Sequence, residues 1–176
     1  MGDLKQLANL LSSCNSIDEE IGAIIGRPAS TGHIGEYIAA EIFDIELSES
    51  ASEKSLDGYF QSGSLANSSV NIKYYTVRGS ILDITPDSLP DYYLVMMGSS
   101  VSSESSRGMV YPANIASVHI FESSSLMSAL RERGVQIGIA TSVVRHLWDA
   151  AEVYPQQTNE AITISGEQRE KLFLFS

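Results

Sequence analysis

A polar pair inside an apolar segment is the first feature of this sequence that could do chemistry. Asn71 and Lys73 are two residues apart within residues 69–75, so their side chains share a face if the segment is a β-strand. Val70 and Ile72 then point to the opposite face, where a core is expected. A lysine in such a strand needs a partner or a task, because burying an uncompensated charge is costly.

Two carboxylates upstream can join this pair. Glu36 lies within an almost uninterrupted apolar stretch, and Asp57 precedes a glycine. A buried carboxylate must be hydrogen-bonded, paired with a cation or bound to a metal ion. Glu36, Asp57, Asn71 and Lys73 therefore form the candidate site, provided that the elements carrying them meet.

The apolar pattern predicts the element that carries Glu36. Residues 32–43 are apolar nearly all round, which is typical of a largely buried helix, and Ser30 or Thr31 can cap its start. The other candidates fall on strands. Residues 57–60 and 70–77, separated by a turn rich in Gly, Ser and Asn, predict a β-hairpin, and residues 92–97 predict a central strand beside it.

The chain before this region predicts a pair of amphipathic helices, residues 3–14 and 16–25, broken at Asn15-Ser16. The expected role of this helical cap is to cover one side of the domain or to pair with a partner subunit, which would make a homodimer. We expect one domain over residues 1–176, divided into the helical pair (1–28) and an α/β core (29–176) with a mixed central sheet flanked by helices.

The second half of the chain predicts a further set of shorter elements. These are strands at residues 115–121 and 161–164, a helix from about residue 123 to Gly134, a helix at residues 142–152 and a last helix capped by Ser165 with Gln168.

Charge and cysteine content narrow the class of function. The formal net charge is −11, and residues 1–66 hold 11 acidic against 3 basic residues. Such a chain has no overall attraction for nucleic acid, so DNA binding would require a local basic surface, for which Arg131, Arg133, Arg145 and His146 are candidates. One cysteine, no apolar run of membrane-spanning length and no signal peptide indicate a cytoplasmic protein without a membrane partner.

The order of these residues resembles the PD-(D/E)XK nuclease superfamily, which has the restriction-endonuclease-like fold. In that family an early helix often carries a glutamate, and two adjacent strands carry an aspartate and a (D/E)-x-K tripeptide. Here the corresponding residues are Glu36, Asp57 and the tripeptide Asn71-Ile72-Lys73. The segments Gly-His-Ile-Gly-Glu-Tyr-Ile, Leu-Asp-Gly-Tyr-Phe and Val-Asn-Ile-Lys-Tyr-Tyr also look like a family of uncharacterised microbial proteins assigned to this fold.

The resemblance implies a metal-dependent DNA endonuclease of restriction or defence type. It assigns Asp57, Glu36 and Asn71 to a Mg²⁺ (or Mn²⁺) ion, with Asp57 as the central ligand, and gives Lys73 the task of orienting water or stabilising developing charge. Phosphodiester hydrolysis needs such an ion to neutralise the phosphate and activate water. Asn71 stands where the family has an acid, which removes one negative charge from the expected metal site.

Each candidate also has a structural interpretation. Glu36 can hydrogen-bond backbone groups in the core, Asp57 with Gly58 can be turn chemistry at a strand end, and Lys73 can pair with either acid. Together these interpretations describe the alternative function, a catalytically inactive nuclease-like fold that acts as a binding or interaction module. His33 and His119 are expected to serve a helix N-terminus and the core, respectively.

Overall fold

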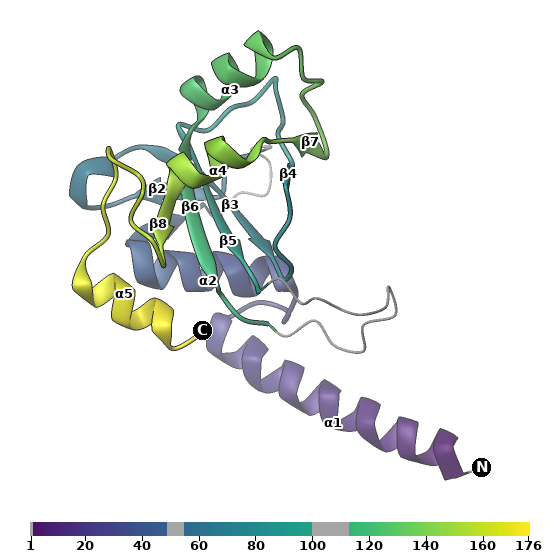
Figure 1. The fold of residues 1–176 in the computed structure, drawn as a ribbon. Helices are drawn as coiled ribbons and strands as arrows, with labels where there is room; N and C mark the ends of the chain where they lie inside the picture. Colours follow the sequence, from purple (N-terminus) through teal and green to yellow (C-terminus); the bar gives the residue numbers. More distant parts are fainter. Residues whose placement is uncertain (1, 49–54, 100–112) are drawn as a thin grey trace.

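The computed structural model describes residues 2–48, 55–99 and 113–176. It confirms an α/β protein built on a mixed six-stranded sheet (Figure 1). The strand order is β1-β2-β3-β5-β6-β8; β3 and β5 are parallel and every other neighbouring pair is antiparallel. The strands are β1 (Ile45–Leu47), β2 (Gly58–Phe60), β3 (Ser69–Tyr75), β5 (Tyr92–Met97), β6 (Ser117–Glu122) and β8 (Glu152–Tyr154).

Helices cover both faces of this sheet, as predicted. One core joins α2 to the side chains of Val70 and Ile72 on β3, and the other joins α3 and α4 to β5 and β6. Two short strands, β4 and β7, form a separate antiparallel pair. The remaining elements are α1 (Gly2–Ile25), α2 (Thr31–Phe43), η1 (Gly63–Leu65), β4 (Ile81–Leu82), α3 (Ser123–Glu132), β7 (Thr141–Ser142), α4 (Arg145–Ala151) and α5 (Gly166–Phe173).

Local sequence explains how α2 is placed against β3. The Ser30 hydroxyl accepts a hydrogen bond from the backbone N–H of His33, which caps the helix as predicted. Gly35 then allows a close approach, because a Cβ atom at this position would lie 2.5 Å from the Cβ of Tyr74 on β3. Gly35 precedes Glu36, so the same contact holds Glu36 beside the sheet.

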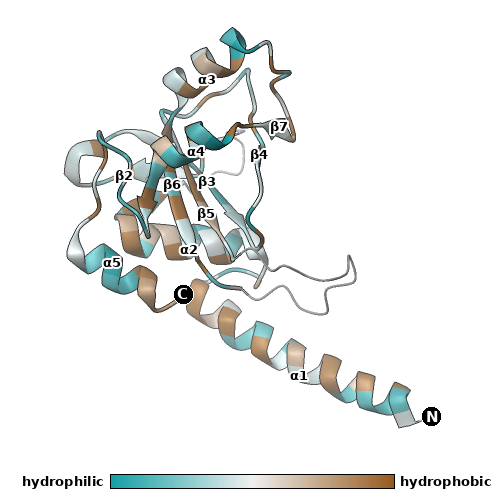
Figure 2. Cartoon of the chain, viewed as in Figure 1, coloured by the Kyte–Doolittle hydropathy of each residue, from teal (hydrophilic) through white to brown (hydrophobic). Residues whose placement is uncertain are grey.

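The N-terminal helical pair predicted for residues 1–28 is wrong. α1 is one continuous helix through Asn15-Ser16, and Gly26 ends it with a left-handed φ of +69°. Within the helix, the hydroxyls of Ser13 and Ser16 donate to the carbonyls of Asn9 and Ser12, one turn earlier. None of its residues is buried, so α1 does not cover the domain as a cap would; Figure 2 shows it projecting from the body.

Several boundaries differ because pairing between distant segments decides them. β1 and β8 were not predicted; each has three residues and exists through its neighbour, β2 or β6. The helix predicted at residues 142–152 is shorter, since its ends are used in β7 and β8. Residues 161–164 form no strand, whereas the capping box of Ser165 and Gln168 is present. No helix in the described part of the chain is long and apolar enough to cross a membrane.

Candidate functional site

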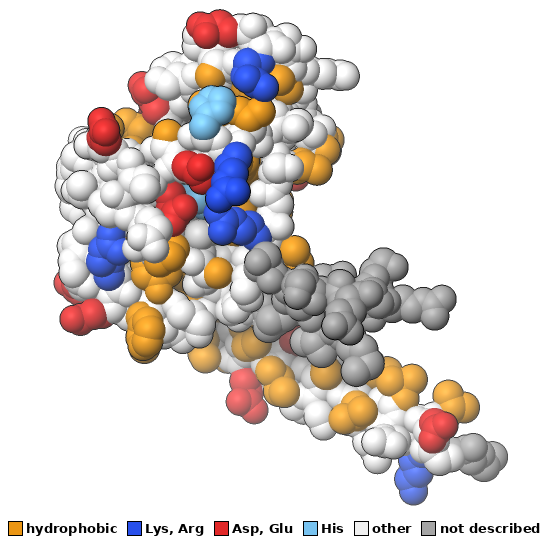
Figure 3. All heavy atoms as spheres, viewed as in Figure 1, with side chains coloured by type: hydrophobic (Ala, Val, Ile, Leu, Met, Phe, Trp, Pro, Cys, Tyr) orange, Lys and Arg blue, Asp and Glu red, His pale blue; other side chains and the backbone are white. Residues whose placement is uncertain are grey.

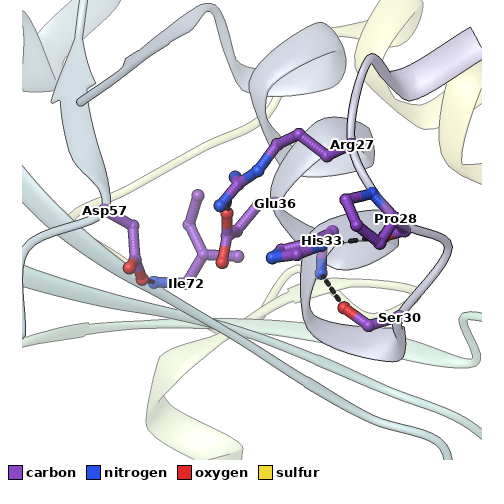
Figure 4. A network of polar contacts seen from close by, with 7 residues as sticks. All are labelled: Arg27, Pro28, Ser30, His33, Glu36, Asp57 and Ile72. Carbon is purple, nitrogen blue, oxygen red and sulfur yellow. Dashed lines mark hydrogen bonds and ion pairs between the residues drawn. The ribbon is translucent and has the colours of Figure 1, made fainter. Parts of the chain in front are cut away.

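The candidate site lies where β2 and β3 separate. β2 pairs with the start of β3, Gly58 opposite Val70, whereas β5 pairs with β3 as far as Tyr75. The pairing of β2 with β3 ends at Gly58, so β2 offers no backbone acceptor to the N–H of Ile72. The Asp57 carboxylate takes that place, accepting this N–H through Oδ2 at 2.6 Å (Figure 4). Asp57 thus closes the paired part of the hairpin at an edge of the sheet.

Charges from three other elements act on Asp57. Burial is the largest influence and raises the pKa of its carboxyl above the ordinary 3.8. The Ile72 N–H opposes this rise, the Glu36 carboxylate adds to it, and the Lys73 and Arg27 cations again lower the pKa. Glu36, Lys73 and Arg27 therefore all act electrostatically on Asp57.

Arg27 belongs to this neighbourhood, and sequence reasoning missed it. It lies in the linker between α1 and α2, and its guanidinium Nη1 forms an ion pair with Glu36 Oε2 (Figure 4). The side chains of Arg27 and Glu36 are 46% and 21% exposed, so the pair lies at the border of the protein surface. The only available signal was an isolated base in a strongly acidic third of the chain.

Lys73 differs from Arg27 because it makes no ion pair with any residue that the structure describes. It is half-buried on β3. Ile72 packs into the α2 core, so the alternation of the strand turns Lys73 towards the face that carries α3 and α4. Lys73 and Glu36 therefore start on opposite faces of the sheet, and each acts on Asp57 electrostatically without a direct contact to it.

Asn71 lies on the same strand and is 3% exposed. Its side-chain oxygen Oδ1 is buried and has no hydrogen-bond partner among the described residues. An unsatisfied buried acceptor costs about 1–3 kcal/mol. Asn71 is thus an incompletely satisfied polar group, two residues from Lys73 and on the same face.

The oxygen ligands available for a metal ion are few. Among the described residues, no group of three His, Cys, Asp or Glu side chains could hold a metal ion. Asp57 and Glu36 supply two carboxylates, and Oδ2 of Asp57 and Oε2 of Glu36 already have partners. Mg²⁺ commonly binds to one or two carboxylates while keeping several waters, so these residues fit this ion.

The other candidates have structural partners. The His33 ring shares a 2.8 Å hydrogen bond with the Pro28 carbonyl, at the N-terminus of α2 as expected. Arg145 forms an ion pair with Asp149 along α4, at 3.6 Å, while Arg131, Arg133 and His146 are exposed. A cavity of about 880 Å³ lies between α2, the β1–β2 edge and α5, and none of the four predicted site residues lines it.

No protein-family model and no curated protein matches this chain.

Proposed function

We propose that the protein is a metal-dependent DNA endonuclease of the restriction-endonuclease-like fold. The convergence of Glu36, Lys73 and Arg27 on Asp57 carries this proposal. Two carboxylates and two cations from α2, β3 and the segments before β2 and α2 act on one another at the sheet edge. The resemblance in the order of Glu36, Asp57 and Lys73 along the chain assigns this arrangement to phosphodiester hydrolysis.

In the proposed site Asp57 and Glu36 hold the metal ion. Asn71, which the resemblance assigns to the same ion, is buried on the face of β3 away from Glu36 and is not counted as a ligand in this arrangement. When bound, Mg²⁺ would neutralise charge on the scissile phosphate and lower the pKa of a bound water. The mutual repulsion of Asp57 and Glu36, which raises the pKa of Asp57, is relieved by a divalent cation.

Lys73 has the properties required of a catalytic cation in this site. Its charge acts on Asp57 but it is not engaged in an ion pair within the described chain, so its ammonium group is available to a phosphate or to the attacking water. Lys73 and Arg27 also supply local positive charge in a chain whose net charge is −11. A local attraction of this kind is what a DNA ligand needs from an acidic protein.

The test is cleavage of plasmid and single-stranded DNA in Mg²⁺ or Mn²⁺ by the wild type and by an Asp57→Asn, Lys73→Met variant. We expect the double variant to lose about 100-fold or more of the rate, because a ligand and a charge-stabilising group are both removed. The matched control is Glu167→Gln, Lys171→Met, which also removes one acid and one base, from an ion pair on α5. This control should cut like the wild type.

Two results would contradict the proposal. The first is a wild type that cuts none of these DNA substrates with either metal. The second is equal cleavage by the wild type and the Asp57→Asn, Lys73→Met variant, because the activity would then come from a contaminant.

A nuclease-like fold that binds without cutting is the second candidate. The Arg27–Glu36 ion pair favours it, because it occupies an oxygen that the metal site would use, and so does the amide of Asn71 in place of an acid. Fluorescence anisotropy with labelled DNA separates the two candidates: saturable binding without cleavage in either metal supports the binding module.

A further inference from the structure

The apolar side of α1 is an exposed surface that the proposed site does not explain. Figure 3 shows hydrophobic side chains along the projecting helix, which has no buried residue. The large exposed side chains include six from this helix, each at least 51% exposed: Leu4, Leu7, Leu10, Leu11, Ile17 and Ile24. Singly exposed apolar residues are ordinary, but a contiguous row usually marks an interaction surface.

These residues follow a regular spacing. Leu7, Leu10, Cys14, Ile17, Ile21 and Ile24 are separated by alternating steps of three and four residues, which is the spacing of the a and d positions of a heptad repeat. We call these six residues the α1 seam. Leu4 and Leu11 lie along one border of the seam, at e positions, and widen it in the way that is typical of helices packed in bundles. The spacing therefore indicates that the partner of α1 is another helix.

The middle of α1 also needs a partner to remain helical. Ser12, Ser13, Asn15 and Ser16 are poorer helix formers than Ala or Leu, and the serine hydroxyls can compete for the backbone. Most helical stability in proteins comes from packing of an apolar face. The body of the protein supplies little of this packing, because only three residues of α1, all in its last turns, are half-buried: Ile21, Gly22 and Ile25.

We infer that the α1 seam pairs with the α1 seam of a second copy of this chain, with the two helices antiparallel. The seam is self-complementary: placing Leu10 opposite Ile21 of the other copy also places Leu7 opposite Ile24 and Cys14 opposite Ile17. α1 is about 36 Å long at 1.5 Å per residue, and this arrangement uses the whole seam.

Charge decides the direction. Asp18, Glu19 and Glu20 lie in consecutive positions of α1. A parallel pair would set these acidic turns of both copies side by side, where like charges repel. In the antiparallel pair each acidic turn faces uncharged residues 11–13 of the other copy. The two domains, attached at the C-terminal ends of the helices, then lie at opposite ends.

The first test is the mass of the full chain in solution. Light scattering after gel filtration should give at least twice the chain mass of 19.1 kDa for the wild type and the single-chain mass for a Leu10→Glu, Ile17→Glu variant. The matched control, Asn9→Glu and Ser16→Glu, adds the same charge at the same spacing on the opposite side of α1 and should assemble like the wild type. Trp148 fluorescence reports whether each domain is folded, because this residue is 5% exposed and far from α1 in sequence.

Disulfide formation under mild oxidant tests the direction with α1 left intact. Cys14 is the only cysteine, and in this register its two copies are offset by three residues, about 4.5 Å along the helices, so the wild type should cross-link less than a variant whose cysteines face each other directly. An Ile17→Cys variant should cross-link, because residue 17 faces Cys14 of the other copy. A monomeric wild type, or a control that dissociates like the seam variant, overturns the inference, and cross-linking of wild-type Cys14 as efficient as that of the Ile17→Cys variant overturns the antiparallel direction.

Discussion

The sheet carries two polar sites of opposite kind, one around His119 and one around Asp57. Both contain a titratable side chain whose pKa is shifted mainly by burial. They differ in what the surrounding chain does with the remaining polar atoms. The His119 site stabilises the fold, whereas the Asp57 site leaves polar groups available to another molecule.

The His119 site is closed. His119 is 1% exposed on β6, its Nδ1 lies 3.0 Å from the Trp148 carbonyl oxygen and its Nε2 lies 3.1 Å from the Ser117 hydroxyl. The Trp148 ring packs edge-on against the imidazole, with the ring centroids 5.1 Å apart. Both nitrogens are used within the protein, so this is a satisfied core histidine, as the sequence predicted.

The Asp57 site is only partly closed. One carboxylate oxygen of Asp57 serves the fold by accepting the Ile72 N–H, but Lys73 forms no ion pair within the described chain, and Asn71 Oδ1 is left without a partner there. Natural proteins tolerate such incompletely satisfied groups mainly where function requires them. The comparison predicts that replacing a group that the fold uses, in either site, costs stability, whereas replacing a group of the open site that has no partner costs little.

The largest expected effect on stability comes from His119. Burial lowers its pKa from 6.5 to about 4, so the unfolded chain binds a proton that the folded protein does not bind between these values. The free energy of unfolding should therefore fall by about 3 kcal/mol as pH drops from above 6.5 to below 4. Urea unfolding at several pH values measures this fall, and a His119→Gln variant should lack it.

The matched control replaces an exposed histidine, His146→Gln, and should keep the pH dependence of the wild type. Carboxylates also titrate in this range, so the difference between variants, and not the absolute slope, is the observable. An identical pH dependence for wild type and His119→Gln would show that His119 is not held in a closed, neutral site.

Replacing Asp57 should have an intermediate effect that depends on the new side chain. Asp57→Ala leaves the Ile72 N–H without an acceptor and should cost about 1–3 kcal/mol, whereas Asp57→Asn keeps an oxygen there and should cost less. The raised pKa means that folded Asp57 binds its proton more tightly than the unfolded chain does, so its contribution to stability is lost as pH rises above 3.8. The free energy of unfolding of Asp57→Asn, relative to that of the wild type, should therefore be highest at neutral pH, and urea unfolding at several pH values measures it.

Equal losses for Asp57→Ala and Asp57→Asn would mean that the charge, and not the hydrogen bond, is what the fold needs. The comparison between an open and a closed site would then fail.

The parts of the fold that were predictable are those fixed by local pattern. A short stretch of sequence is enough to indicate each of four features: the Ser30 cap, the apolar run of α2, the β2–β3 hairpin and the continuous apolar strand β5. β1 and β8 were missed because three residues become a strand only when a distant neighbour pairs with them. The break predicted at Asn15-Ser16 was wrong because low helix propensity alone does not end a helix, and the Ser13 and Ser16 hydroxyls bond to carbonyls one turn earlier while the backbone stays helical.

The candidate site, like the fold, was predictable only where local sequence patterns determine it. The order of Glu36, Asp57 and Lys73 placed three charged groups on elements that do meet, since the hairpin register and α2 packing follow from local signals. Arg27 was missed because its ion pair with Glu36 depends on the direction in which the linker leaves Gly26. The unpartnered oxygen of Asn71 could not be predicted either, because satisfaction of a buried amide depends on every neighbour that surrounds it.

The smallest expected effect, and the sharpest test of the open site, comes from its two cations. Lys73→Met removes a half-buried charge that has no ion-pair partner in the described chain, so stability should stay within about 0.5 kcal/mol of the wild type or rise. Arg27→Met leaves Glu36 without its cation, but the pair lies near the surface, so the loss should stay below about 1 kcal/mol and shrink in high salt. Urea unfolding at low and high salt measures both. A loss of more than 2 kcal/mol for Lys73→Met would make Lys73 a structural group like His119, because only a cation that the fold itself requires is so costly to remove.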